Sequence, residues 1–260
     1  MHARFAFGQN SSERTRNTYL KPDIVQQRQY TLDRLDLKRD ENALDIGCGP
    51  GLLVNEMAKQ TGQNGLITGV DPSQPMLEMA EKLCRDQNNT LFQQADAEAL
   101  PFESAAFDVA VSVQVLEYVH NIDQALLEIH RVLKPGGRAL IIDTDWDSLV
   151  WNNSDRERML NALKIWQSHR EDSFLPRKLP AKLRQAKLSL SKLSIYPIIN
   201  TAFSDQDYSY FLAKSICNHL TDHLPSEQIN NWFQDLVSKD DQNDYFFSLN
   251  RYVFEVIKQP

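Results

Sequence analysis

A glycine-rich segment that follows a short apolar run constrains this chain more than any other feature of its sequence. The apolar run covers residues 43–46 and continues as Gly47-Cys48-Gly49-Pro50-Gly51, after which residues 51–60 carry apolar side chains at helical spacing. Glycines in such a turn let backbone N–H groups approach a ligand closely. The spacing is G-x-G-x-G. Leu52 stands where a dinucleotide fingerprint needs its third glycine, and the Gly-Lys-Ser/Thr of a P-loop is absent. The segment therefore predicts a strand–turn–helix unit that binds a ligand lacking a pyrophosphate.

Strand and helix patterns alternate on both sides of this turn. Strands are predicted over 43–46, 66–70, 90–95, 107–113 and 138–143, and helices over 51–60, 73–83 and 121–133. The last of these helices is expected to stop at Lys134-Pro135-Gly136-Gly137, because proline removes a donor and glycine tolerates positive φ. Further strands are predicted over 188–199 and 245–257, with two amphipathic helices between them. Strands separated by helices of this length predict a doubly wound α/β sheet with parallel pairing.

Acidic residues follow two of the predicted strands, where ligands bind in an open parallel sheet. Asp71 ends the second strand, 20 residues after Gly51, and a carboxylate there can accept both hydroxyls of a ribose. The alternative is that Asp71 only caps the turn before Pro72. Asp96 follows the third strand and could accept from an exocyclic adenine amine, although ordinary turn chemistry explains it equally well.

Composition and charge exclude several classes of protein. The 260 residues include 28 Lys+Arg and 35 Asp+Glu, a net charge of −7, which disfavours a nucleic-acid partner because such binding depends on clustered cations. The hydrophobic content of 42% is sufficient for a real core. No apolar run has the length of a membrane span or of a signal peptide, so we expect a cytoplasmic protein.

Neither the cysteines nor the other common metal ligands show the spacing of a metal site. Cys48, Cys84 and Cys217 form no C-x-x-C pair, which indicates a reducing compartment without a disulfide frame or a zinc knuckle. The segment 143–147 begins like a calcium loop but lacks its glycine and glutamate, and Leu220 stands where a zinc-binding helix with His219 and His223 would need glutamate. We therefore predict no metal site.

Five motifs in this order resemble those of a known family. They are the run over 43–51, Gly69-Val70-Asp71-Pro72-Ser73, the segment 96–102, Phe107-Asp108-Val109 and the segment 133–138. Together they resemble the class I S-adenosylmethionine-dependent methyltransferases, and within them the small-molecule branch typified by the ubiquinone/menaquinone biosynthesis C-methyltransferases. The resemblance covers about residues 40–145. It implies a Rossmann-like, seven-stranded, mostly parallel sheet whose last strand is antiparallel.

The resemblance implies which residues hold the methionyl end of the cofactor, S-adenosylmethionine. Asp45 and the backbone of Gly47 and Gly49 would hold this end, and Gln114, after the fourth strand, would meet the methionyl ammonium. An acidic, carbonyl-rich pocket suits a sulfonium cation on electrostatic grounds, and Asp45 fits that role.

The resemblance also implies which residues hold the adenosine. Asp71 would bind the ribose hydroxyls, with Pro72 and Met76 bordering the adenine. Asp96 would accept a hydrogen bond from the adenine amine, and Ala97 would supply a backbone contact.

No catalytic residue follows from the sequence. The implied mechanism is direct in-line displacement, in which the protein contributes mainly positioning and exclusion of water. If a base is required, the titratable candidates near the methyl group are Glu117, His120, Asp143 and Asp145. For each of them a structural role explains the residue better than a catalytic one. Glu117 and His120 could lie on a solvated helix face, and Asp143 and Asp145 could simply end a strand.

Substrate choice is expected to reside outside the matched segment. We predict an N-terminal helical cap over 1–40 that includes Phe5, Phe7 and Tyr19, a cofactor-binding core over 41–200, a helical lid insert over 201–244, and the last strand within 245–260. With Trp146 and Trp151 as walls, these segments would enclose a small, apolar or aromatic acceptor.

Besides a small-molecule methyltransferase in general, the sequence allows one specific variant of it, an arsenite methyltransferase, and two other functions. The fold could bind S-adenosylmethionine without transferring methyl, as a regulatory subunit or a repurposed cyclase. An arsenite methyltransferase would need several converging thiols, and a macromolecular methyltransferase finds neither a basic patch nor an N-P-P-Tyr-like motif after the fourth strand. The sequence leaves open the accepting atom and the oligomeric state.

Overall fold

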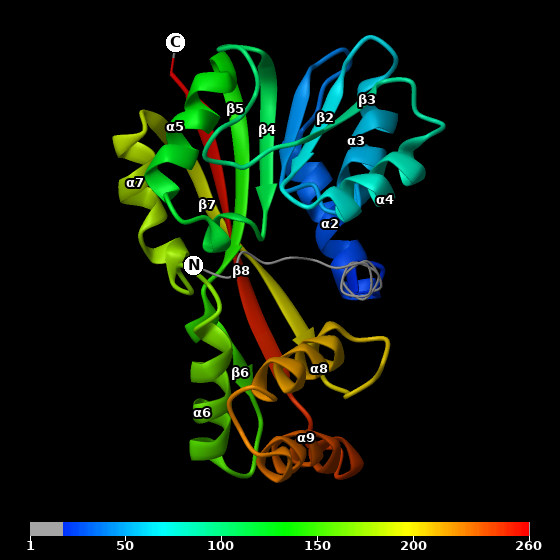
Figure 1. Cartoon of the computed structure of the whole chain (residues 1–260), viewed down its shortest axis with the longest axis vertical. Coiled ribbons are helices and arrows are strands. Elements are labelled where there is room, and N and C mark those ends of the chain that lie inside the picture. The colour runs from blue at the N-terminus through cyan, green and yellow to red at the C-terminus, as the bar shows by residue number, and fades with distance from the viewer. Residues whose placement is uncertain (1–17, 260) are drawn as a thin grey trace.

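A mixed sheet of eight strands runs through the computed structural model, which describes residues 18–259 (Figure 1). Its strands are β1 (Ala43–Ile46), β2 (Ile67–Asp71), β3 (Thr90–Gln94), β4 (Phe107–Val113), β5 (Leu133–Thr144), β6 (Val150–Trp151), β7 (Leu188–Asn200) and β8 (Phe247–Lys258). The α-helices are α2 (Pro22–Leu35), α3 (Leu52–Thr61), α4 (Gln74–Cys84), α5 (Ile122–Val132), α6 (Arg156–Gln167), α7 (Leu179–Gln185), α8 (Tyr208–Leu220) and α9 (Ser226–Asp241). Short 3-10 turns are η1 (Leu116–Tyr118), η2 (Trp146–Ser148) and η3 (Leu175–Arg177).

The strand order is β3-β2-β1-β4-β5-β8-β6, and β7 also pairs with β8, along the edge opposite to β5. The first five strands pair in parallel, whereas β8 runs antiparallel to β5, β6 and β7. This confirms the predicted doubly wound, mostly parallel sheet with an antiparallel last strand. The eighth strand, β6, was not predicted, because two residues are too few to show a periodic pattern.

The β5 strand begins earlier than the predicted 138. Leu133 pairs with Phe107 and Arg138 with Val109, so the segment 134–137 bulges opposite a single residue of β4, Asp108. The Lys134 ammonium lies 2.7 Å from the Asp108 carboxylate and ties the bulge to β4. The Pro-Gly-Gly sequence thus ends α5 at Val132, as predicted, but continues as an irregular strand rather than a loop.

Helices cover both faces of the sheet. On one face, α2, α3 and α4 bury side chains such as Leu32, Met57 and Leu77 against the strands. On the other face, α5 and α7 do the same, for example with Ile129 and Leu183. The two faces are therefore separate hydrophobic layers on a common sheet, as expected for this architecture.

The β7 and β8 strands extend past the carboxyl ends of the parallel strands into a second lobe (Figure 1). There α6, α8 and α9 pack together with β6 around a third hydrophobic cluster, in which the Trp151 ring lies 5.6 Å from Trp232 and 5.0 Å from Phe247. Both α8 and α9 lie within the predicted lid insert, and α6 shares their cluster. The exact domain boundaries stay a prediction, and the first 17 residues of the proposed cap lie outside the described residues.

Among residues 18–259, every helix is too short or too polar to cross a membrane.

The tight turn into α3 gives a direct test of this packing. Gly51 and Gly136 have nearly the same left-handed φ, 76° and 79°. A Cβ on Gly51 would lie 2.7 Å from the Cβ of Ala80 in α4, whereas a Cβ on Gly136 would meet nothing within 4 Å. We expect Gly136→Ala to lower the free energy of unfolding by about 1 kcal/mol through backbone strain. Gly51→Ala should cost an additional ~1–3 kcal/mol through overpacking.

Urea unfolding followed by circular dichroism measures both free energies. Since the backbone strain is matched, the difference between the two variants isolates the contact between the glycine turn and α4. Equal losses in the two variants would contradict this packing.

Candidate functional site

The carboxyl ends of the central strands form the candidate site. In the parallel register, Asp45 of β1 lies between Gly69 of β2 and Val111 of β4. Adjacent strands are about 4.8 Å apart, so groups that follow β1, β2 and β3 spread over roughly 10 Å. A ligand bound along this edge can therefore reach Asp45, Asp71 and Asp96 in turn.

The glycine loop after β1 is held by backbone hydrogen bonds to β2. Gly47 has φ 72° and donates its N–H to the Val70 carbonyl at 2.7 Å. A Cβ there would lie 2.3 Å from the side chain of Val115. Gly49 has φ 51°, and the nearest atom to its hypothetical Cβ is the Cε2 of Tyr19, at 3.8 Å. Gly47 is thus required by close packing, whereas a Cβ on Gly49 would make only an ordinary contact with Tyr19.

Asp71 is oriented by the loop that it caps. Its carboxylate accepts the N–H of Gly49 at 2.9 Å and the N–H of Ser73 at 2.8 Å. Burial raises the pKa of Asp71 above its ordinary value, although both hydrogen bonds oppose this shift. An ionised carboxylate has about four acceptor sites, so two remain for ligand hydroxyls. Turn capping and ribose binding are therefore compatible roles for this residue.

Asp45 is a buried acid without a compensating cation. Its side chain is 3% exposed. Burial, followed by the neighbouring charge of Asp71, raises the pKa of Asp45 to about 7, and no cation of the described residues offsets these two effects. A ligand that brings positive charge to this position would stabilise the ionised form. The uncompensated Asp45 thus fits a ligand that carries positive charge, such as S-adenosylmethionine with its sulfonium and ammonium.

The predicted adenine-side residues lie along the same edge, farther from Asp45. Pro72 is exposed at the turn after β2, while Met76 is buried in the first turn of α4. Ala97 is buried, and Asp96 is exposed and accepts the N–H of Glu98 at 3.0 Å. Ordinary turn chemistry accounts for that hydrogen bond, so the ligand roles of these four residues stay predictions.

Gln114 closes the end of β4 in a strained conformation. Its φ is 58°, in the left-handed region that non-glycine residues rarely adopt. The side-chain amide donates to the Ile142 carbonyl at 3.3 Å, and its oxygen accepts the Thr144 hydroxyl at 2.5 Å. Gln114 therefore ties β4 to β5, and its predicted contact with the methionyl ammonium stays a prediction.

Two of the candidate bases contact a charged side chain of another segment. His120 is exposed and lies 3.3 Å from the Glu171 carboxylate. Asp145 accepts hydrogen bonds from the Arg177 guanidinium at 2.5 and 2.8 Å, and Asp147 accepts a third at 2.6 Å. His120 is thus engaged by Glu171, and the charge of Asp145 is offset by Arg177.

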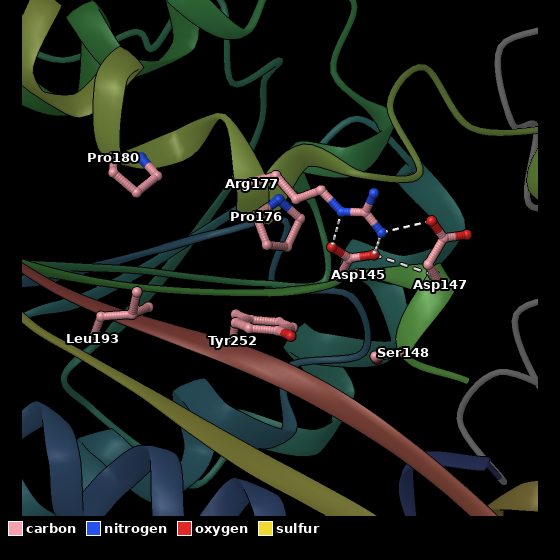
Figure 2. A pocket seen from close by; sticks show the side chains of 8 residues that line it. All are labelled: Asp145, Asp147, Ser148, Pro176, Arg177, Pro180, Leu193 and Tyr252. Carbon is pink, nitrogen blue, oxygen red and sulfur yellow. Dashed lines mark hydrogen bonds and ion pairs between the residues drawn. The ribbon is translucent and has the colours of Figure 1, made fainter. Parts of the chain in front are cut away.

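A cavity of about 510 Å³ lies beside Arg177 and its two aspartate partners (Figure 2). Figure 2 shows Arg177 directed at both Asp145 and Asp147, with Tyr252 and Leu193 on the adjacent strands. None of the lining residues belongs to the glycine loop. The cavity is therefore separate from the edge where Asp45 and Asp71 lie.

The other two candidate bases, Glu117 and Asp143, are fully buried. The Glu117 carboxylate accepts the indole N–H of Trp146 at 2.6 Å and lies 3.3 Å from the Arg170 guanidinium. The interpretation of Glu117 as part of a solvated helix face is therefore wrong, because η1 turns its side chain inward. Burial, and then the charge of Glu117, raises the pKa of Asp143 well above its ordinary value. The backbone N–H groups of Val115 and Glu117 partly oppose this shift, yet neither carboxylate oxygen makes a hydrogen bond of normal geometry.

Two buried arginines were missed by sequence reasoning. Arg170 lies 3.7 Å from the ring centroid of Trp146 and 4.9 Å from that of Trp166. Arg251 lies on β8 and is 4% exposed. The available signal for Arg251 was a lone arginine within a strand otherwise rich in aromatic and aliphatic residues. Arg170 follows α6 in a polar stretch and offered no signal.

Comparisons with known proteins identify a methyltransferase domain in the segment that includes β1 to β4. The family model described as "Methyltransferase domain" matches residues 44–141. The demethylmenaquinone methyltransferase of Lactobacillus johnsonii is 40% identical over 114 residues, which cover 43% of this chain and 47% of that protein. The ubiquinone/menaquinone biosynthesis C-methyltransferase UbiE of Idiomarina loihiensis is 37% identical over 119 residues, which cover 45% and 47%. The chain thus spans about half the length of these curated relatives.

Solved structures share the fold over most of the chain. The YcgJ protein of Bacillus subtilis has a TM-score of 0.63 at 19% identity and covers 90% of this chain and 98% of its own. A phosphoethanolamine N-methyltransferase of Haemonchus contortus in complex with S-adenosyl-L-methionine has a TM-score of 0.65 at 17% identity, with 99% and 59% covered. The [4+2]-cyclase SpnF has a TM-score of 0.60 at 21% identity, with 90% and 80% covered. The match over residues 44–141 thus identifies a methyltransferase domain in this segment of the chain, and the solved structures show that the whole chain shares the fold of methyltransferase structures.

Proposed function

We propose that this chain transfers a methyl group from S-adenosylmethionine to a small, apolar or aromatic metabolite. One arrangement carries the proposal: the uncompensated Asp45 precedes the glycine loop, and that loop orients Asp71 on the next strand. A sulfonium, a backbone-bound methionyl group and a ribose diol would satisfy these three features in that order.

The chain's own residues position the reactants. When bound, S-adenosylmethionine supplies an activated methyl group whose leaving group is already built in, so in-line attack by the acceptor needs little further chemistry. Asp45 would hold the positive end, and Asp71 would fix the ribose at the next strand. Both candidate bases that are buried, Glu117 and Asp143, have raised pKa values and lie out of contact with water. We therefore assign the rate enhancement to positioning and water exclusion rather than to a named base.

The second lobe and the start of the described chain support an enclosed acceptor. Tyr208, the first residue of α8, lies 5.2 Å from the Arg251 guanidinium, so the predicted lid reaches the edge of the sheet. Tyr19 reaches the same edge from the N-terminal side, against Gly49. We propose that residues 201–244, with the N-terminal cap, wall the acceptor and keep water from the methyl group.

The remaining predictions concern location and partners. A cytoplasmic site of action, which the three free thiols support, stays a prediction. The absence of a nucleic-acid partner also stays a prediction, and it rests on the net charge of −7.

The alternative of a cofactor-binding protein that transfers no methyl group is less well supported. One structural neighbour, SpnF, is a [4+2]-cyclase, so the fold hosts other chemistry. The two curated relatives described above are methyltransferases by name, which favours transfer.

Incubation with methyl-labelled S-adenosylmethionine separates the two functions. The purified chain would be offered a panel of quinols, phenols and amines, and labelled product would be measured after separation. We expect transfer to at least one apolar or aromatic acceptor and none with Asp45→Asn. Tight cofactor binding with no labelled product across the panel would favour the binding-only function.

The raised pKa of Asp45 predicts the pH dependence of cofactor binding. Only the ionised carboxylate attracts a cation, so affinity for S-adenosylhomocysteine, whose ammonium remains charged, should rise from pH 5.5 to 8 with a midpoint near pH 7. In Asp45→Asn this rise should be lost. Calorimetric titrations at several pH values measure it, and an unchanged slope in the variant would contradict the assignment.

The same shift has a consequence for the free protein. A carboxyl whose folded pKa is raised binds more protons in the folded state, so stability falls as pH rises from about 4 to about 7. Asp45→Asn should therefore melt at a higher temperature than the wild type at pH 8, and the gap should close near pH 4. This reversal between stability and binding serves as the internal control for the titration.

A further inference from the structure

Arg251 is a buried cation to which the described residues offer no direct anionic partner. Its Nη1 donates to the side-chain oxygen of Gln27 on α2, whereas its Nε is buried without a hydrogen-bond partner. No carboxylate of residues 18–259 lies within 4 Å of the guanidinium. Arginine is almost never fully buried unless it is paired, because removing its charge from water is costly. The arrangement therefore lacks an anion.

The buried acids that interact electrostatically with Arg251 are engaged elsewhere. Arg251 pairs across the sheet with Thr144, and the adjacent pair is Asp143 with Tyr252. Because successive residues of a strand point to opposite faces, Arg251 and Asp143 lie on opposite sides of the sheet. Glu117 is paired with another arginine, Arg170. Neither acid can supply the missing direct contact.

Arg251 nevertheless lies at the carboxyl end of the parallel strands, because it pairs with Thr144, whose hydroxyl donates to Gln114 after β4. The ring of Tyr19 lies beside Gly49, since a Cβ on this glycine would be 3.8 Å from the Cε2 of Tyr19. The buried Tyr19 hydroxyl has a pKa raised to about 12 by burial, and the charge of Arg251 lowers this value while that of Asp71 raises it. The Tyr208 ring lies 5.2 Å from the guanidinium. Tyr19 thus connects the glycine loop with Arg251, and α8 covers that arginine.

We propose that Arg251 binds a carboxylate of a small molecule held at this site. The inference rests on the proposed function, since it assumes that a ligand occupies the edge of the sheet beside Gly49. The planar guanidinium matches a carboxylate with parallel N–H donors, and its free Nε is one of them. Two sources share this chemistry, namely the methionyl carboxylate of the cofactor and an acid group on the acceptor.

Two cofactor fragments distinguish these sources. S-adenosylhomocysteine carries the amino-acid carboxylate, and 5′-methylthioadenosine lacks it. Calorimetric titration of wild type and Arg251→Met measures the affinity for each. If the methionyl carboxylate is the partner, Arg251→Met should weaken S-adenosylhomocysteine binding at least tenfold and leave 5′-methylthioadenosine binding unchanged, and Arg251→Lys should restore part of the loss.

The acceptor source is tested on protein saturated with S-adenosylhomocysteine. Benzoate should then raise the melting temperature of the wild type but not of Arg251→Met, while the uncharged benzamide should have no such effect on either. In this case the affinities for both cofactor fragments should be the same in the two proteins.

The matched control is Arg34→Met, which removes another arginine that contacts β8, through its ion pair with Glu255. This variant should leave both affinities unchanged. Equal weakening of both fragments in Arg251→Met, or no effect on either fragment together with no benzoate shift, would overturn the proposal. If the wild type binds neither fragment, the proposed function itself fails, which is a separate outcome.

Discussion

Buried carboxylates without a cation beside them are the constraint on which the candidate site depends. Asp45 and Asp71 lie on adjacent strands; burial raises the pKa of both, and the charge of Asp71 raises that of Asp45 further. This arrangement does not stabilise the fold, because a buried acid of raised pKa destabilises the folded state at neutral pH. A cationic ligand that binds along the sheet edge offsets the cost. Our proposal therefore assigns to this edge a cationic ligand, the sulfonium of S-adenosylmethionine.

The rest of the fold holds these two groups in place. The parallel register aligns the ends of β1, β2 and β4, and the glycine loop donates a backbone N–H to Asp71. Val115 packs so closely on Gly47 that any side chain there would displace it. Gln114, strained at φ 58°, fixes the adjoining end of β4 to β5. Backbone strain and close packing are concentrated at this edge, as is common at functional sites.

Much of this arrangement could be predicted from the sequence. The strand limits of β1 and β4 were predicted to the residue, and β2, β3, β7 and β8 to within about two residues, because apolar periodicity and turn residues mark them. The glycine spacing located the loop, and the acid after β2 located the second carboxylate. These features are local, so a single stretch of sequence carries each of them.

The predictions that failed depended on contacts between distant segments. Glu117 was expected on a solvated face, but Trp146 and Arg170, which lie 29 and 53 residues further along the chain, bury it. The surroundings of Arg251 depend on tertiary structure: Tyr19, from near the start of the described chain, interacts with it electrostatically, and Tyr208, from α8, packs against it. The bulge at 134–137 depends on pairing with β4, which a helix-stop pattern does not reveal. Tertiary pairing, rather than local propensity, decided each of these cases.

The most direct test of the account is the affinity of S-adenosylhomocysteine for the wild type and for Asp71→Ala, measured by calorimetry on protein whose folding is confirmed by its melting curve. If Asp71 holds the ribose, its loss should weaken binding by roughly 1.5–3 kcal/mol, the scale of a hydrogen bond to a charged group. An affinity that is the same in both proteins, or no measurable binding to the folded wild type, would contradict the claim that this edge of the sheet grips an adenosyl cofactor.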